Sequence, residues 1–164
     1  MRSRATLTLS SCMAAAWLLT GCPADDGEDD DVGVEPDFPA DYQGSFVEVR
    51  NCRPSGDHEL NTIRILAGPT ALEPYQTRAM PFPPGAVVLK EEYEFGDLDC
   101  TGPLKQWTVM RRLEDGSSTE TLDWTWQKVD ADRHVVAVDT PACYGCHTDC
   151  GVLPDGFDGT CAVP

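Results

Sequence analysis

Apolar and polar residues alternate most clearly along residues 121–129, where Leu122, Trp124 and Trp126 are separated by single polar residues. A period of two is typical of a strand that buries one face and exposes the other. A turn-forming run of acidic residues, glycine and serine separates this segment from another largely apolar one at residues 106–113. The two segments together predict a β-hairpin.

Four other short segments rich in β-branched and apolar residues predict further strands, because turn-forming residues bound each of them. They are residues 45–50, 61–66, 86–95 and 135–138. Residues 68–76 predict a short helix with Pro69 in its first turn, and a second short helix is predicted to begin at Pro141. The pattern therefore predicts an α+β fold, in which a mostly antiparallel β-sheet is accompanied by two short helices.

The beginning of the chain has the pattern of an export signal. Residues 1–4 include two arginines, and residues 5–20 form an uncharged apolar run that is too short for a membrane-spanning helix. The run ends in Leu-Thr-Gly followed by Cys22, which resembles the lipobox of bacterial lipoproteins. This resemblance implies that residues 1–21 are a lipoprotein signal peptide and that Cys22 is lipidated, the alternative being an ordinary secretory signal. The mature protein is then expected to be lipid-anchored in the bacterial cell envelope, facing the periplasm or the outer surface.

Acidic residues dominate residues 22–41, which contain no basic residue. Like charges repel along such a segment, so we expect a disordered tether between the lipid anchor and a single domain at residues 42–164. A calcium site at residues 29–31 is the alternative, but the glycine and the distal glutamate of a calcium loop are missing. The formal net charge of the whole chain is −16, which argues against nucleic acid as a partner.

Cys143, Cys146 and His147 form a C-x-x-C-H motif near the end of the chain. Two thiols at this spacing can each bond to one vinyl group of a haem, and the histidine that follows is then held under the iron as an axial ligand. The motif therefore predicts one covalently bound haem c, attached through both cysteines, with His147 as the ligand of the haem iron.

Two alternatives use the same residues without haem. The motif together with Cys150 could bind zinc tetrahedrally, although the chain has no second C-x-x-C and export leads to an oxidising compartment. Cys143 and Cys146 could instead form a disulfide in a haem-free structural lipoprotein. The histidine directly after the second cysteine favours the haem interpretation.

Four other cysteines remain in the domain, namely Cys52, Cys100, Cys150 and Cys161. An exported protein can keep an even number of cysteines as disulfides, and three pairings are open. We favour Cys52–Cys100 and Cys150–Cys161, because the second bond would close the glycine-rich tail directly behind the C-x-x-C-H motif.

Several segments together resemble the cytochrome P-460 family, which includes the beta-type cytochromes c-prime. The most specific is a phenylalanine–proline–proline–glycine turn at residues 82–85, which leads into a strand that ends in Lys90 and Glu91. The other segments are residues 62–64, Tyr75, residues 107–110, residues 123–124 and the C-x-x-C-H motif. The resemblance extends over residues 60–147. It implies an antiparallel sheet with haem c bound against it, usually in a homodimer.

The resemblance also implies roles for individual residues. Lys90 stands where hydroxylamine-oxidising members bond a lysine nitrogen to the haem ring, and Arg64 matches an arginine that could reach a haem propionate. For both, the alternative is a charged residue on the surface of a strand. The oxidising members carry a distal acid on the strand that corresponds to residues 107–114. Here the matching residue is Arg111, with Glu114 nearby. The predicted catalytic residues are Lys90, from its position at the haem ring, and Arg111, from the position of the distal acid.

Members of the family oxidise hydroxylamine or bind nitric oxide. The resemblance therefore implies a membrane-tethered protein with one c-type haem that binds or oxidises a small nitrogen species, and a hydroxylamine-oxidising haem oxidoreductase is one form of this hypothesis. An electron-transfer partner is expected, but the sequence does not identify it. The residues that could supply a sixth iron ligand are His58, His134, Met80 and Met110.

Overall fold

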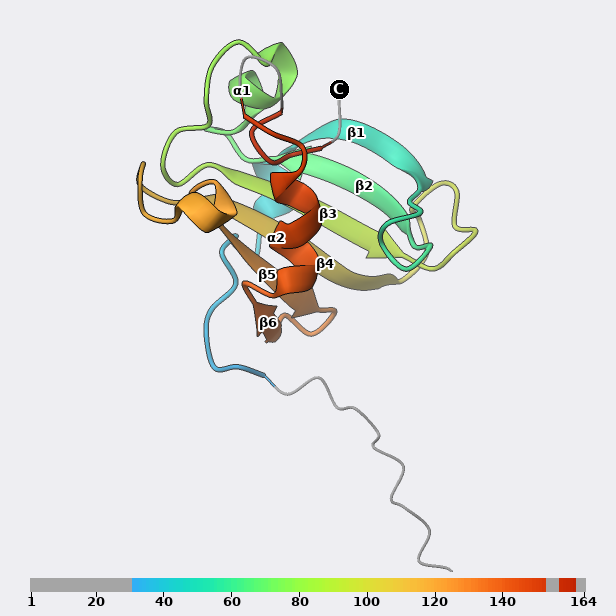
Figure 1. Cartoon of the computed structure of the whole chain (residues 1–164). Coiled ribbons are helices and arrows are strands. Elements are labelled where there is room, and N and C mark those ends of the chain that lie inside the picture. The colour runs from blue at the N-terminus through green and yellow to red at the C-terminus, as the bar shows by residue number, and fades with distance from the viewer. Residues whose placement is uncertain (1–30, 153–156, 162–164) are drawn as a thin grey trace, which may run out of the picture.

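Six antiparallel strands form one sheet in the computed structural model, which describes residues 31–152 and 157–161 (Figure 1). Each strand pairs with the next along the chain, so the order across the sheet is β1-β2-β3-β4-β5-β6. The strands are β1 (Val47–Pro54), β2 (Thr62–Ala67), β3 (Val87–Tyr93), β4 (Leu104–Arg112), β5 (Trp124–Asp130) and β6 (Val135–Val138). Within these described residues the α-helices are α1 (Leu72–Thr77) and α2 (Pro141–Thr148), and 3-10 turns occur at Tyr42–Gly44 and Thr119–Thr121. The predicted α+β fold with a mostly antiparallel sheet and two short helices is confirmed.

The pleat of the strands gives the sheet two faces, each with its own apolar core. The first face shares a core with α1, and this core contains Ile63, Ile65, Val88, Met110 and Trp126. The core on the opposite face contains Leu66, Leu89, Trp107, Val109 and Val129. In Figure 1, α2 lies across the sheet, and its residues Cys143 and Tyr144 pack against the core of the first face. A site between α2 and the sheet is therefore formed by side chains of the first face.

The strand register places side chains from several strands in one row across the first face. Lys90 on β3 pairs with Ile65 on β2 and with Thr108 on β4. Thr108 in turn pairs with Lys128 on β5. Because residues two apart on a strand point to the same face, Glu92 lies beside Lys90 on the first face. The register thus brings several polar groups onto an otherwise apolar surface.

The strand that was predicted to include Leu122 begins only at Trp124. Leu122 and Asp123 have φ values of 53° and 58°, which are incompatible with a strand. The Asp123 carboxylate accepts hydrogen bonds from the backbone N–H groups of Gly116 (2.9 Å) and Ser118 (2.7 Å). This side chain closes the loop between β4 and β5, and the loop geometry overrides the alternating pattern at its end.

Residues 31–41 pack on the sheet, although the sequence predicted a solvated tether for them. Phe38 is buried in the core on the face opposite α2. The backbone N–H of Val32 donates a hydrogen bond to β6 at 2.8 Å, and Asp37 accepts one from Arg111 on β4 at 2.6 Å. Phe38 shows that this part of the acidic segment has an apolar group to bury. The folded part of the chain therefore begins before Tyr42.

The predicted membrane-directed segments lie outside the described residues. These are the signal peptide at residues 1–21, the lipidation site Cys22 and the tether as far as residue 30. Within the described part of the chain, no helix is long and apolar enough to cross a membrane.

Both of the favoured disulfides are present. Cys52 in β1 is bonded to Cys100 in the loop before β4, and Cys150 after α2 is bonded to Cys161. Cys143 and Cys146 are free thiols among the described cysteines. The predicted pairing is confirmed, and the third disulfide of the haem-free alternative is not formed.

Candidate functional site

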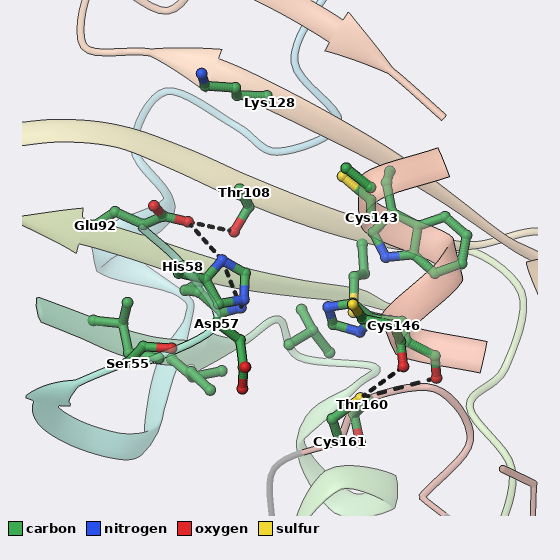
Figure 2. A pocket seen from close by; sticks show the side chains of 18 of the residues that line it. Ser55, Asp57, His58, Glu92, Thr108, Lys128, Cys143, Cys146, Thr160 and Cys161 are labelled. Carbon is green, nitrogen blue, oxygen red and sulfur yellow. Dashed lines mark hydrogen bonds and ion pairs between the residues drawn. The ribbon is translucent and has the colours of Figure 1, made fainter. Parts of the chain in front are cut away.

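A cavity of about 770 Å³ lies between α2 and the first face of the sheet. Its volume is within the range of pockets that hold a drug-sized ligand, roughly 300–1,000 Å³. Cys143, Cys146 and His147 of α2 line one side, and the sheet lines the other with both apolar and polar side chains. Figure 2 shows the two cysteines on one side of the cavity and His58 with Glu92 on the other.

The helix α2 presents the whole C-x-x-C-H motif to this cavity. Pro141 occupies the first turn of the helix, where a backbone N–H would have no helical partner. Residues three and four apart lie on the same side of a helix, so Cys143, Cys146 and His147 all reach the cavity. Tyr144 packs against Trp126 of β5, with the ring centroids 6.3 Å apart, and this contact holds α2 against the sheet.

His147 has one ring nitrogen engaged by the protein and one that remains for another ligand. Its Nδ1 lies 2.6 Å from the carbonyl oxygen of Gly159, so Nδ1 carries the proton and donates it. The ring also packs against Trp126, at a centroid distance of 6.0 Å. Burial, reinforced by the positive charge of Lys90, lowers the pKa of His147 to about 4. The imidazole is therefore neutral at physiological pH, with Nε2 available as a metal ligand.

Lys90 enters the cavity from the sheet. Its Nζ contacts Nε2 of His58, which belongs to the loop between β1 and β2. Burial lowers the pKa of Lys90 to about 8, although the negative charge of Glu92 opposes this shift. An amine with a pKa of this value exchanges its proton readily near neutral pH.

The carboxylate of Glu92 lies beneath His58 and is only 1% exposed. One of its oxygens is 3.3 Å from Nδ1 of His58. Thr108, Asn61 and Gln106 donate further hydrogen bonds to it at 3.0, 3.0 and 2.8 Å. Burial alone would raise the pKa of Glu92, but the hydrogen bonds outweigh it and lower the pKa to about 2. Glu92 is therefore a permanently charged group that fixes the orientation of His58.

Two predicted site residues, Arg64 and Arg111, lie on the face of the sheet opposite the cavity. Nε of Arg64 donates to the buried carboxylate of Glu91 at 2.6 Å, and Arg111 pairs with Asp37 at 2.6 Å. Neither arginine is among the described residues that line the cavity. Neither arginine is therefore placed to act in this cavity, which contradicts the propionate role predicted for Arg64 and the catalytic role predicted for Arg111. Alternation along β2 and β4 directs both side chains away from α2, and the nearby Glu114 is exposed in a loop.

The four residues considered as a sixth iron ligand fall into two groups. His58 and Met110 line the cavity. His134 is exposed and pairs with Asp130 at 3.2 Å, and Met80 is 41% exposed. Only the first two lie near the C-x-x-C-H motif.

Two contributors to the cavity were missed at the level of sequence. Glu92 could have been found, because it stands two residues after Lys90 on the same strand and so shares its face. Trp126 was recognised only as an apolar core residue. It lines the cavity, and its indole Nε1 is buried without a hydrogen-bond partner among the described residues. A polar group of a molecule bound in the cavity could satisfy this donor.

The donor set fits a haem c better than a zinc ion. Zinc would need Cys150, which is consumed by its disulfide with Cys161. The described residues contain no group of three or more His, Cys, Asp or Glu that could hold a metal ion. A covalently attached haem requires two free thiols three residues apart and a neutral imidazole with a free nitrogen, and the cavity supplies both together with apolar side chains such as Ile63 and Val88.

Comparison with known families agrees with this donor set. The family model for cytochrome P460 matches residues 39–151, which include all six strands of the sheet and α2. A search of curated proteins finds no match. The family implies a haem cofactor and chemistry with nitrogen species, in keeping with the C-x-x-C-H motif and the strand that carries Lys90. Because the match covers well over half of the chain, the protein belongs to the cytochrome P460 family.

Proposed function

We propose that the protein carries a single haem c in the cavity between α2 and the sheet, and that it binds or oxidises a small nitrogen species there. The observation that carries this proposal is the convergence of Cys143, Cys146 and Nε2 of His147 on one cavity. The two thiols are free to form thioethers, and the imidazole is held in the tautomer that leaves Nε2 for the iron.

The haem, when bound, supplies an iron centre that can coordinate a small nitrogen compound and exchange electrons with it. The chain supplies the remaining functions. His147 would hold the iron through Nε2, and apolar side chains such as Ile63, Val88 and Met110 limit the access of water. Lys90, oriented by His58 on the wall opposite α2, donates hydrogen bonds to a polar ligand and accepts protons from it.

This polar pair favours a small polar substrate such as hydroxylamine, and nitric oxide is the second candidate. Hydroxylamine offers N–H and O–H groups that the Lys90 amine, held by His58, can bind. Nitric oxide lacks a proton to give, so its binding depends on the iron and on the apolar wall. Oxidation of hydroxylamine further requires removal of protons, for which the pKa of Lys90, about 8, is suitable.

A bond from Lys90 to the haem ring, as in the hydroxylamine-oxidising members, is a separate part of the proposal. The Lys90 side chain ends in the cavity, and burial keeps part of its amine neutral and nucleophilic near neutral pH. Forming the bond would replace an N–H of Lys90 and a C–H of the ring, and an external two-electron oxidant such as a peroxide would have to accept the electrons. Protease digestion followed by mass measurement tests it. A haem that joins the Lys90 peptide to the α2 peptide supports the bond, and an ordinary c-type ferrous spectrum excludes it.

Haem staining of a denaturing gel tests the central proposal, since thioether-bound haem survives denaturation. The protein must be produced in a host that exports it and attaches c-type haem. The expected result is a stained band, and the intact mass should equal that of the mature polypeptide with its acyl chains and one haem. The matched control is the Cys143→Ser/Cys146→Ser variant, which retains His147 and both disulfides and should give an unstained band.

An unstained band from the parent protein would overturn the haem assignment and favour the haem-free structural lipoprotein. Optical titration of the stained protein with hydroxylamine and with nitric oxide then separates the two ligand classes. Binding of neither would overturn the proposed ligand class while leaving the haem in place.

We also propose that Cys22 is acylated and tethers the protein to a membrane of the cell envelope. The support is the lipobox-like sequence before Cys22. Mass analysis of the mature N-terminal peptide tests this, and a peptide without acyl chains excludes it. A homodimer and a separate electron-transfer protein are the partners expected from the family resemblance, and size-exclusion chromatography tests the dimer.

A further inference from the structure

The carbonyl of Gly159 is the acceptor for Nδ1 of His147, and it belongs to the segment that follows α2. The two residues are 12 apart in sequence, and the oxygen lies 2.6 Å from the nitrogen. Hydrogen bonding at this nitrogen governs how strongly the opposite nitrogen donates to a metal. Whatever holds Gly159 in place therefore acts on the proposed iron ligand.

Gly159 is held by contacts with the sheet and with the end of α2. Its own N–H donates to the carbonyl of Gly151 at 3.2 Å, and its φ is +76°, which glycine adopts without strain. The indole Nε1 of Trp124 donates to the carbonyl of Asp158 at 2.9 Å. A Cβ on Gly159 would lie only 3.4 Å from that indole nitrogen. The carbonyl is thus fixed against a fully buried side chain of β5.

The neighbouring Asp158 is anchored independently. Its carboxylate is buried, lies 3.4 Å from Nη1 of Arg112, and accepts a hydrogen bond from the backbone N–H of Phe82 at 3.3 Å. On the other side, Thr160 receives a hydrogen bond from Arg78. These contacts tie both neighbours of Gly159 to the body of the domain.

A disulfide joins this segment to the end of α2. Cys150 follows α2 and is bonded to Cys161, and the backbone N–H of Phe157 donates to the carbonyl of Cys150 at 3.0 Å. Figure 2 shows Thr160 and Cys161 beside Cys146, at the end of the cavity. We use the term C-terminal clasp for residues 157–161 together with this disulfide.

We propose that the C-terminal clasp is a positioning element for the proximal histidine, and that the Cys150–Cys161 bond sets the electron donation of His147 to the iron by holding the Gly159 carbonyl against Nδ1. The inference rests on the proposed function, because it requires a haem ligated by His147. A hydrogen bond from Nδ1 to a carbonyl raises the basicity of the imidazole and so favours the ferric state. An intact clasp therefore lowers the midpoint potential of the haem, and an opened clasp raises it.

The test compares the two disulfides of the same domain. Cys150→Ser/Cys161→Ser removes the clasp bond, and Cys52→Ser/Cys100→Ser removes the other disulfide, whose cysteines do not line the cavity. For the first variant we expect a ferric-to-ferrous equilibrium shifted about tenfold toward ferrous, which corresponds to about 59 mV for a one-electron couple. The iron–histidine stretching frequency of the ferrous protein, measured by resonance Raman spectroscopy, should fall. The second variant should change neither quantity.

A chemical experiment covers the case in which the clasp variant does not mature. The mature Cys52→Ser/Cys100→Ser protein keeps only the clasp disulfide among the described bonds, and Cys161 is exposed to solvent. Thiol reductants open this bond and leave thioethers intact. The iron–histidine frequency should fall on reduction and recover on reoxidation.

A second variant, Trp124→Phe, removes the donor to Asp158 and should shift the potential in the same direction by less. An unchanged potential and frequency in both the clasp variant and the reduced protein, with haem present, would overturn the inference alone. A parent protein without covalent haem would overturn the proposed function, and the haem stain reveals this before any potential is measured.

Discussion

Nδ1 of His58 lies 3.3 Å from the carboxylate of Glu92, on the wall of the cavity that faces α2 (Figure 2). The carboxylate is buried and charged, so it holds the imidazole ring in one orientation. The other ring nitrogen of His58 contacts the amine of Lys90. Two contacts thereby orient a loop residue at the cavity wall, next to the space where a ligand of the iron would bind.

Substitution of His58 should weaken ligand binding by the haem-loaded protein. His58→Ala removes the contact that orients the Lys90 amine toward a polar ligand. If the hydrogen bond from Lys90 to the ligand is lost as a result, roughly 1.4 kcal/mol is lost with it, so the affinity of the ferric protein for hydroxylamine should fall about tenfold. Optical titration of the haem absorption measures this affinity. The matched control is His134→Ala, because His134 is exposed and lies outside the cavity. Equal affinities in the two variants would show that His58 does not position Lys90 for ligand binding.

The buried carboxylate of Glu92 predicts acid sensitivity. Its pKa is about 2 in the folded protein, whereas its ordinary value is 4.5. Ionised Glu92 therefore stabilises the fold above about pH 4.5, and this contribution is lost as the pH falls toward 2. A pKa difference of this size is worth about 3 kcal/mol. Urea unfolding between pH 7 and pH 3 should show a falling free energy of unfolding in the parent protein and a flatter dependence in Glu92→Gln.

Glu94→Gln is the control for this measurement, because the side chain of Glu94 is 72% exposed and pairs only with Lys105 in the described part of the chain. That variant should retain the acid sensitivity of the parent protein. A Glu92→Gln variant with the same pH dependence as the parent would mean that other carboxylates govern the acid transition.

The sheet could be predicted from sequence because each strand carries its own local signals. The segments at residues 86–95 and 135–138 are bounded by turn residues, and they correspond to β3 and β6 within a few residues. The side of the sheet to which a given charge points depends on register. Arg64 and Lys90 both occupy strands with mostly buried neighbours, yet they face opposite sides. Register is set by pairing between distant segments, so it could not be obtained from either segment alone.

The site was predictable where its chemistry is local and unpredictable where it depends on packing. The C-x-x-C-H motif at residues 143–147 specifies thiols and imidazole within five residues. The partner of Lys90 is His58, which the chain brings from 32 residues away. The partner of His147 is a backbone carbonyl at Gly159, and a carbonyl has no signature in the sequence. Pairing of Cys150 with Cys161 was the one indication that the tail returns to α2.

The two disulfides should differ in their effect on stability. Cys52 and Cys100 are 48 residues apart, and Cys150 and Cys161 are 11 apart. Loop-closure entropy predicts losses of about 4 and about 3 kcal/mol when the bonds are removed as serine pairs. Urea unfolding of the two double variants measures these losses. Cys52→Ser/Cys100→Ser is therefore expected to lose more stability and yet to keep the haem potential of the parent protein. A shifted potential in Cys150→Ser/Cys161→Ser then cannot be a consequence of lower stability alone.

Substitution of Arg64 tests its corrected assignment to the far face of the sheet. Arg64→Met removes the cation beside the buried Glu91 carboxylate, which is only 1% exposed. Loss of a buried pair usually costs 3 kcal/mol or more, but Tyr42 and Tyr93 continue to donate hydrogen bonds to Glu91 and Arg64 is itself 28% exposed. We therefore expect a loss of about 2 kcal/mol in the free energy of unfolding. Haem content and the ferrous spectrum should not change.

The conservative variant Arg64→Lys is the matched control, because it keeps the positive charge next to Glu91 while losing the fork of the guanidinium group. It should lose less stability than Arg64→Met and should also retain the haem. Stability is measured by urea unfolding, and haem content by absorption per polypeptide. A loss of haem in Arg64→Met without a loss of stability would indicate that Arg64 contacts the haem. It would contradict the assignment of Arg64 to the face of the sheet opposite the cavity.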